Sequence, residues 1–197
     1  MISIVDYGVG NLKSIKKALE MVGAKTKITR DLEDLKNSSG IVLPGVGAVR
    51  PAMEKLKELK EFIKSTDVPV LGICLGMQLF ATLSYEGGEV ECLNIIPGVV
   101  RKFQDDVGKI PHMGWNQIEI VKDNELLHGI ESGTFFYFVH SYFLETEKSF
   151  ILTETDYGIS FASAVSKDNY YGVQFHPEKS GDDGIKLLEN FYRICRA

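Results

Sequence analysis

Cysteine is scarce in this chain of 197 residues, which has Cys74, Cys92 and Cys195. An odd number without a C-x-x-C pair fits neither a disulfide framework nor a zinc site, so we expect free thiols in a reducing compartment and no bound metal. No apolar run approaches the ~18 residues of a membrane span, and the first residues lack the basic and apolar regions of a signal peptide. These absences predict a cytoplasmic protein that does not enter a membrane.

A clustered basic surface is also missing. Lys and Arg number 22 against 27 Asp and Glu, which gives a formal net charge of −5. The densest basic stretch, 55–64, is interleaved with Glu54, Glu58 and Glu61 and is typical of a solvated helix face. Because nucleic-acid binding depends on a clustered basic face, we expect no nucleic-acid partner. Hydrophobic residues at 44% and charged residues at 25% are ordinary for a globular protein and exclude extensive disorder.

The first half of the chain alternates strand-like and helix-like patterns. Strands alternating with helices predict βαβ units, and therefore a parallel sheet with both faces covered. Asn11 is the expected N-cap of the first helix, and Gly23 is expected to end it. The strands expected in this half cover 2–5, 25–29, 40–43 and 68–73, and the expected helices cover 12–22, 51–63 and 74–83.

The second half, from Glu89 to Gln174, is mostly strand-like, and a helix over 184–194 closes the chain. No linker or repeat interrupts it, so we expect one α/β domain over residues 1–197 whose parallel sheet is extended by antiparallel strands. The strands expected here cover 99–103, 116–121, 135–143, 151–155, 159–165 and 171–175, with turns at Asp105-Asp106 and Lys167-Asp168-Asn169.

Cys74 stands in an unusual frame, Gly72-Ile73-Cys74-Leu75-Gly76, between an expected strand and an expected helix. This is the sulfur version of the G-x-S-x-G nucleophile elbow, in which a tight turn lifts the nucleophile above the sheet. The position at a helix N-terminus would favour the thiolate over the thiol. A buried structural cysteine is the alternative that this motif alone leaves open.

A thiolate nucleophile needs a base, and the base needs an orienting partner. His176-Pro177-Glu178 offers both directly after the last expected strand, with a proline that stiffens the turn. By itself, His176 is equally compatible with a surface histidine in a loop. His112 and His140 compete for the role, whereas His128 is interpreted as a structural residue at a helix end.

Acyl transfer also needs donors for the developing oxyanion, and loss of one donor costs about 10²–10³ in rate. Pro44-Gly45-Val46-Gly47 follows the expected strand 40–43, and its glycines allow a backbone N–H to point inward beside that of Leu75. A simple glycine turn is the alternative interpretation.

Together, these three motifs resemble the class I (triad) glutamine amidotransferases, and the resemblance covers essentially the whole chain. Within that superfamily, segments 6–11, 111–116 and 140–142 are similar to the glutaminase subunits of imidazole glycerol phosphate synthases, which serve histidine biosynthesis. The resemblance implies a three-layer, flavodoxin-like α/β fold with a mostly parallel sheet extended by antiparallel strands.

The resemblance further implies a role for each motif residue. Cys74 would attack the carboxamide of glutamine to form a glutamyl thioester, His176 would protonate the departing ammonia and later activate water, and Glu178 would hold the imidazole. No cofactor is implied. The implied oxyanion donors are Val46, Gly47 and Leu75, and the residues implied to surround glutamine are Gly47, Gln78, Glu86, Ser141 and Tyr142. Glu86 fits an exposed turn residue equally well.

In the resembled family, the ammonia passes to a separate cyclase subunit with a (β/α)₈ barrel, so the resemblance implies a heterodimer. Asn11, Trp115 and Lys179 match positions near the subunit interface, although burial in the core is an alternative for Trp115. Glutaminase activity is expected to be weak until the partner carries its nucleotide ligand. Reorientation of a peptide within Gly45-Val46-Gly47 is the hypothesis for that switch.

Three other functions stay open at this point. The first is another glutaminase of the superfamily, such as that of anthranilate synthase, or a γ-glutamyl hydrolase; segments 7–11 and 111–116 disfavour both. The second is a nucleotide-binding module, because Gly8-x-Gly10 begins a helix, although Lys13 stands where a third glycine belongs. The third is a catalytically silent interaction subunit.

Overall fold

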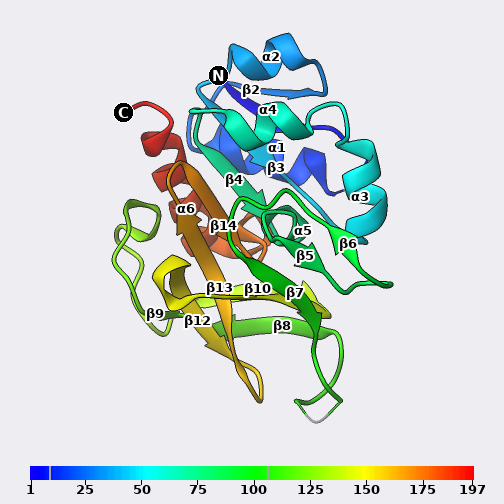
Figure 1. Cartoon of the computed structure of the whole chain (residues 1–197). Coiled ribbons are helices and arrows are strands. Elements are labelled where there is room, and N and C mark those ends of the chain that lie inside the picture. The colour runs from blue at the N-terminus through cyan, green and yellow to red at the C-terminus, as the bar shows by residue number, and fades with distance from the viewer. Residues whose placement is uncertain (9, 106) are drawn as a thin grey trace.

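The computed structural model describes residues 1–8, 10–105 and 107–197. Val9 and Asp106, which fall in two of the expected turns, lie outside the described residues. The centre of the molecule is an eight-stranded sheet (Figure 1). Its strands, in spatial order, are β2 (Thr26–Thr29), β1 (Ile2–Val5), β3 (Gly40–Leu43), β4 (Val70–Ile73), β14 (Tyr170–Val173), β13 (Ser160–Lys167), β12 (Ile151–Asp156) and β9 (Glu119–Ile120).

The pairs from β2 to β14 are parallel, and those from β14 to β9 are antiparallel. Two smaller sheets complete the lower part of the molecule in Figure 1. A two-stranded ribbon pairs β8 (His112–Gln117) with β10 (Phe135–His140), and a four-stranded sheet contains β11 (Tyr142–Thr146), β7 (Gly98–Lys102), β5 (Leu83–Ser84) and β6 (Val90–Glu91). The chain passes from the ribbon to the four-stranded sheet at Ser141.

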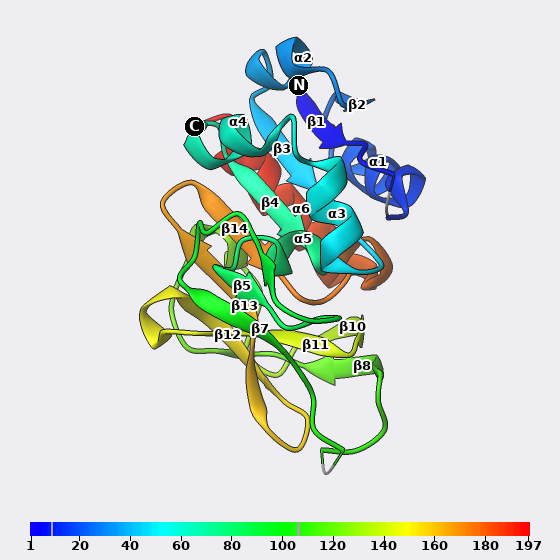
Figure 2. The ribbon, with the colours of Figure 1, turned by 45° about the vertical axis from the view of Figure 1, so that its right-hand side comes forward.

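Helices cover both faces of the parallel strands (Figures 1 and 2). Side chains of one strand alternate between two cores: Ile4 packs with the helices α1 (Leu12–Met21) and α6 (Gly181–Ile194), and Val5 packs with α3 (Val49–Lys55), α4 (Lys60–Ser65) and α5 (Leu75–Gln78). The remaining helices are α2 (Leu32–Lys36) and three single turns, η1 (Glu125–Leu127), η2 (Lys148–Phe150) and η3 (Pro177–Lys179). No helix of the described ranges is long and apolar enough to cross a membrane.

The predicted fold class is confirmed: a mostly parallel sheet is extended by antiparallel strands. Asn11 caps α1 as expected, because its side chain accepts a hydrogen bond from the Ser14 N–H at 3.3 Å, and Gly23 follows the helix with a φ of +85°. Strand 40–43 has the bounds that its apolar run predicts. A strand that is buried on both faces is apolar along its whole length, so its ends coincide with the ends of the apolar run.

Several expected boundaries are wrong. The single helix expected over 51–63 is two helices, because a tightened turn in which Leu59 N–H donates to Leu56 O at 2.9 Å interrupts it while the apolar stripe continues. The helix expected over 74–83 is the four-residue α5. Ser141 breaks the strand expected over 135–143, and 116–121 is divided between the end of β8 and β9. The short elements α2, β5 and β6 were not predicted.

Candidate active site

Cys74 lies in the sharp turn between β4 and α5, at a φ of +52° that non-glycine residues rarely adopt. The turn is held by a hydrogen bond from Cys74 N–H to Val173 O at 2.7 Å. A Cβ added at Gly72 would lie 2.6 Å from the backbone of Gly76, and one added at Gly76 would overlap the carbonyl oxygen of Leu43. The elbow therefore requires both glycines, as the sequence motif predicts.

The helix that follows Cys74 is much shorter than expected. A four-residue helix supplies free N–H groups at its start but only a small macrodipole, so the dipole argument from the sequence carries less weight than predicted. The N–H groups of Val46, Gly47 and Leu75 donate no hydrogen bond to any residue that the structure describes. Gly47 has a φ of +109°, with open space where a side chain would begin, so backbone conformation is what requires glycine there.

A pocket of about 270 Å³ opens above Cys74. It brings together all three oxyanion candidates and all five candidates for glutamine binding, which come from four separate stretches of the chain. Val139 and His140, which the sequence does not assign to binding, complete its wall. The pocket is lined by Val46, Gly47, Cys74, Leu75, Gln78, Glu86, Val139, His140, Ser141 and Tyr142.

Two polar side chains of the pocket are anchored. Gln78 Nε2 donates to Tyr142 O at 2.9 Å and to Gln174 Oε1 at 3.1 Å. Glu86 Oε2 accepts from the N–H of Val49, in the first turn of α3, at 2.8 Å. Glu86 is therefore tied to the segment that follows the Gly45-Val46-Gly47 loop, which disfavours the alternative of an unattached turn residue, and its second oxygen stays available to a ligand.

His176 and Glu178 form a buried pair behind the nucleophile. Nδ1 of His176 lies 2.8 Å from Oε1 of Glu178, and both side chains are 2% exposed. The carboxylate can only accept, which assigns the proton to Nδ1. Nε2 is buried without a hydrogen-bond partner in the described ranges. Burial opposes protonation of His176, but its interactions with Cys74 and Glu178 outweigh burial and raise its pKa to about 9.

The competing histidines His112 and His140 are committed to each other. His140 Nδ1 donates to Tyr142 O at 2.8 Å, so its Nε2 must accept, and it does so from His112 Nδ1 at 2.9 Å. His112 Nε2 in turn accepts from Asn116 Nδ2 at 3.2 Å. Burial lowers the pKa of His112 to about 4 and that of His140 to about 3, although the hydrogen bond to Tyr142 opposes the second shift. Neither ring has a nitrogen left for Cys74.

This neutral pair predicts acid-sensitive stability. Below the ordinary histidine pKa of 6.5, the unfolded chain binds protons at His112 and His140 that the folded chain does not bind until about pH 4 and 3. The free energy of unfolding should therefore fall between pH 6.5 and about pH 5, by up to about 1.4 kcal/mol per pH unit for each histidine. His176 adds little in this window, because its raised pKa keeps it protonated in the folded chain and the unfolded chain is mostly protonated below its ordinary pKa of 6.5.

Urea unfolding at several pH values measures that slope. His128 is exposed at the end of η1, so His128→Gln should leave the slope unchanged, whereas His112→Asn should reduce it. A free energy of unfolding that is constant from pH 6.5 to about pH 5 would show that the buried pair titrates like free histidine.

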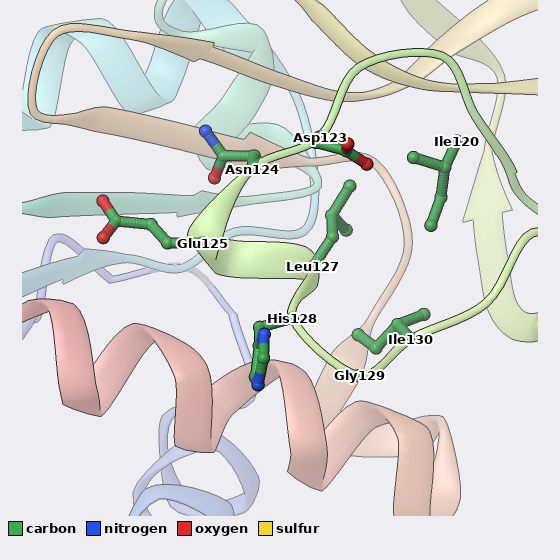
Figure 3. A pocket seen from close by; sticks show the side chains of 8 residues that line it. All are labelled: Ile120, Asp123, Asn124, Glu125, Leu127, His128, Gly129 and Ile130. Atoms are coloured by element: carbon green, nitrogen blue, oxygen red, sulfur yellow. The ribbon is translucent and has the colours of Figure 1, made fainter.

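A larger cavity, of about 510 Å³, lies at η1 (Figure 3). It shares no lining residue with the pocket at Cys74. Asp123, Asn124, Glu125 and His128 are among its lining residues, and the segment that carries them crosses above α6. It contains no paired nucleophile and base. No group of three or more metal-ligating side chains is found anywhere in the described part of the chain. Size alone therefore does not identify the site; the chemistry gathers in the smaller pocket.

Besides Val139 in the pocket wall, two residues next to the pocket were missed by sequence reasoning. Tyr7, at the end of β1, is buried and donates from its hydroxyl to Pro44 O, so it fixes the start of the Gly45-Val46-Gly47 loop. Burial, together with the nearby charge of Cys74, raises the pKa of Tyr7 well above its usual range. Gln174 donates from Nε2 to Cys74 Sγ at 3.5 Å. Both follow strands whose carboxyl ends face the pocket, and that position is the signal that could have identified them.

The three interface candidates lie along one side of the molecule. Trp115 is 56% exposed, which excludes burial in the core, and its ring lies 6.2 Å from that of Tyr137. Lys179 Nζ lies 5.7 Å from the centre of the Tyr137 ring. Asn11 precedes α1, which contacts the η3 turn that carries Lys179. Figure 2 shows α1, β10 and β8 along the same side.

A family model described as "Glutamine amidotransferase class-I" matches residues 3–195. The "Imidazole glycerol phosphate synthase subunit HisH" of Archaeoglobus fulgidus is 58% identical over 196 residues and covers 100% of both chains. The protein of the same name from Methanocaldococcus jannaschii is 50% identical over 98% of this chain and 100% of its own length.

Solved structures agree with the fold. A putative GMP synthase subunit from Thermoplasma acidophilum matches with a TM-score of 0.78 at 22% identity, over 99% of this chain and 93% of its own. The glutaminase domain of Trypanosoma brucei CTPS, solved with bound acivicin, matches with a TM-score of 0.70 at 18% identity, over 98% and 93%. At these identities the likeness supports the fold alone.

Proposed function

This chain belongs to the class-I glutamine amidotransferase family, and from that membership we propose that it is the glutaminase subunit of an imidazole glycerol phosphate synthase. It is an enzyme that hydrolyses glutamine to glutamate and ammonia. The observation that carries the proposal is the pocket that Cys74 lines together with Val46, Gly47 and Leu75, whose N–H groups donate no hydrogen bond among the described residues, with the buried His176–Glu178 pair nearby.

In the first half-reaction, Cys74 Sγ, having given its proton to His176 Nε2, attacks the side-chain carbonyl carbon of glutamine. The carbonyl oxygen becomes an oxyanion in reach of the N–H groups of Val46, Gly47 and Leu75. Collapse of this intermediate breaks the C–N bond, and His176 donates its proton to the leaving nitrogen, which departs as ammonia. The product on the enzyme is a glutamyl thioester.

In the second half-reaction, water attacks the thioester carbonyl while His176 Nε2 takes the proton of that water. The tetrahedral intermediate expels the Cys74 thiolate and leaves glutamate. Glu178 remains ionised throughout, holds the Nδ1–H tautomer and stabilises the imidazolium that forms twice in the cycle. The raised pKa of His176 suits this role, because the imidazolium persists at neutral pH.

The free carboxylate oxygen of Glu86 is the group in the pocket that suits the α-ammonium of glutamine. Backbone groups at Ser141 and Tyr142, where the chain leaves the ribbon, suit the α-carboxylate, and Gly47 and Gln78 complete the contacts. Because Glu86 also accepts from Val49 N–H, a bound ammonium and the segment after the oxyanion loop would share one carboxylate. No cofactor takes part in these steps.

The relatives are named as subunits, so a partner chain is part of the proposal. The finer proposal is a cyclase with a (β/α)₈ barrel that forms a heterodimer with this chain and receives the ammonia. The outer face of the ribbon supports it: Met113, Trp115 and Phe135 are 58%, 56% and 51% exposed there, and Val139 on the same face lines the pocket. A partner on this face would cover the edge of the active site.

Replacing Trp115 with alanine should weaken association with the cyclase by about 30-fold or more, because exposed aromatic anchors dominate such interfaces. Titration calorimetry measures the dissociation constant. Val121→Ala, which removes a comparably exposed apolar side chain directly after β9, in the eight-stranded sheet rather than in the ribbon, is the control and should leave it unchanged. Equal affinity of the two variants would remove Trp115 from the interface.

The function itself is tested by ammonia release from glutamine, measured for the full chain alone, with a candidate cyclase, and with that cyclase carrying its nucleotide ligand. We expect weak activity alone and strong stimulation by the loaded partner. The Gly45-Val46-Gly47 loop is the proposed element that changes, with glycine allowing both peptide orientations at little cost. Equal, high rates in all three samples would contradict the switch, and no release in any of them would contradict the function.

Full-length relatives at 46–58% identity favour this subunit over the other glutaminases considered from the sequence and over a nucleotide-binding module. We further propose that residues 1–197 form one glutamine amidotransferase domain. A cytoplasmic location stays a prediction.

A further inference from the structure

Gln174 is a fully buried side chain that contacts the nucleophile and that the mechanism above does not use. It stands at the carboxyl end of β14, two residues before His176, and is 0% exposed. Its Nε2 lies 3.5 Å from Cys74 Sγ, and its Oε1 lies 3.1 Å from Gln78 Nε2. The amide thus bridges the reacting sulfur and a pocket residue more than 90 positions away in sequence.

The orientation of this amide is dictated by its neighbours. Tyr142 O is a carbonyl and can only accept, so the Gln78 atom that lies 2.9 Å from it is the amide nitrogen. That nitrogen presents its second proton to Gln174, which must therefore offer its oxygen. Turning the Gln174 amide over would place two buried NH₂ groups face to face and would set an oxygen against the sulfur, so with a thiolate both hydrogen bonds would be lost. The nitrogen of Gln174 consequently faces Cys74.

The acceptor that sets this order is itself fixed. Tyr142 O also receives the Nδ1–H of His140, whose ring is held by His112. His140 and Gln78 thus both donate to the carbonyl of Tyr142. Gln78 also donates to the amide oxygen of Gln174, and Gln174 donates to the sulfur. This arrangement keeps a donor, rather than an acceptor, beside Cys74 in every step of the reaction.

We propose that Gln174 is a further catalytic residue, whose amide N–H donates to the Cys74 sulfur and stabilises it as a thiolate. The inference rests on the proposed function, in which Cys74 is the nucleophile. A hydrogen bond to an ionised acceptor is about twice as strong as a neutral one, so the bond strengthens when the sulfur ionises and weakens when the thioester forms. It favours both the attacking thiolate and its departure as leaving group.

Other groups around the sulfur make this donor important. Val139 O, 3.9 Å away, can accept from the thiol but only opposes a thiolate. Tyr7, which follows β1, directs its proton to Pro44 O, and His140, from β10, is neutral. Glu86, across the pocket, carries a negative charge that disfavours the anion. Among the described residues this leaves imidazolium His176 and the Gln174 amide as the side chains that stabilise the charge.

The pH profile of Cys74 alkylation by iodoacetamide tests the proposal on the full chain, because only the thiolate reacts. Gln174→Met keeps the volume and removes the donor, while Gln78 retains its bond to Tyr142. The midpoint of the profile should move up by about one to two pH units, as expected for loss of a hydrogen bond to a charged group. Alkylation below the midpoint should slow by roughly tenfold or more.

Gln174→Glu is the second variant, because it keeps the size and the acceptor for Gln78 but replaces the donor with an oxygen. Its midpoint should lie higher than that of Gln174→Met. Ser163→Ala is the matched control. Ser163 is a buried residue on β13, and its backbone carbonyl accepts a hydrogen bond from the backbone N–H of Gln174. The alkylation midpoint of this variant should equal that of the wild type. Thermal unfolding establishes that each variant is folded.

The outcomes separate this proposal from the proposed function. If the wild-type chain releases ammonia through Cys74 but both Gln174 variants keep the wild-type alkylation profile, the donor role is wrong and the glutaminase stands. If the midpoints shift as predicted while Cys74→Ala leaves ammonia release intact, the donor is present but the proposed nucleophile is wrong. A shift in Ser163→Ala equal to that in Gln174→Met would reduce Gln174 to a packing role.

Discussion

Replacing Cys74 with alanine is expected to lower ammonia release from glutamine by about 10⁴-fold or more in the activated complex, because members of a triad act as a unit and loss of the nucleophile removes the covalent route entirely. The side chain is small and only 6% exposed, so the substitution removes one buried sulfur atom and leaves the elbow backbone in place. Association with the cyclase should be unchanged, since none of the interface candidates is among the residues that line the pocket at Cys74.

Cys92→Ala is the matched control for this change. Cys92 is also buried, and burial raises its pKa to about 12 even though the charge of Lys60 opposes the shift, so it is a poor nucleophile at neutral pH. Its alanine variant should retain full activity per folded molecule. A catalytically silent subunit would predict instead that neither substitution affects ammonia release in the complex.

Replacing Glu178 with glutamine is expected to reduce kcat by about 10³–10⁴-fold, the loss seen when the orienting carboxylate of a triad becomes an amide. An amide can present N–H to Nδ1 of His176 and thereby favour the wrong tautomer. The pair is buried, with both side chains 2% exposed, so water cannot replace the lost acceptor. Binding of glutamine should change little, because Glu178 does not line the pocket.

The pH dependence gives Glu178→Gln a second, independent readout. With a pKa raised to about 9, wild-type His176 should lose its proton, and the enzyme its activity, as pH rises through that value. Removing the carboxylate charge lowers the pKa, so the alkaline limb of kcat/KM should move to lower pH. Glu125→Gln, which changes a carboxylate bonded to Tyr171 away from the pocket, should leave the limb in place. An unmoved limb in Glu178→Gln would contradict the assigned pair.

The local sequence pattern was sufficient to predict the parallel half of the fold and the tight turn at Cys74. Strands such as β1 and β3 are apolar on both faces and short, so their bounds coincide with the apolar runs. Gly72 and Gly76 are demanded by contacts within a few residues and with the adjacent strand, and such demands leave a signature in the sequence. Where an apolar stripe continues across a tightened turn, as at Leu56, pattern alone joins two helices into one.

The contacts that organise the site are a different matter. Gln174 meets Cys74 across 100 positions, His112 meets His140 across 28, and Glu86 reaches Val49 across 37. No periodicity encodes which histidine keeps an unused ring nitrogen beside Cys74, because that depends on hydrogen bonds across the ribbon and from the ribbon to Tyr142 in β11. The break at Ser141 is similarly set by the transfer of the chain from the ribbon to the four-stranded sheet. Motifs and spacing could therefore predict many of the residues at the site, but they could not predict which side chains contact one another.

The most direct test of the glutaminase chemistry is mass spectrometry of the full chain, in complex with its cyclase, after reaction with a diazo ketone analogue of glutamine. One adduct per chain, on the peptide that contains Cys74, is the predicted result, and excess glutamine should slow its formation. An adduct on Cys92 or Cys195, or no adduct while ammonia release continues, would contradict the assignment of Cys74 as the nucleophile.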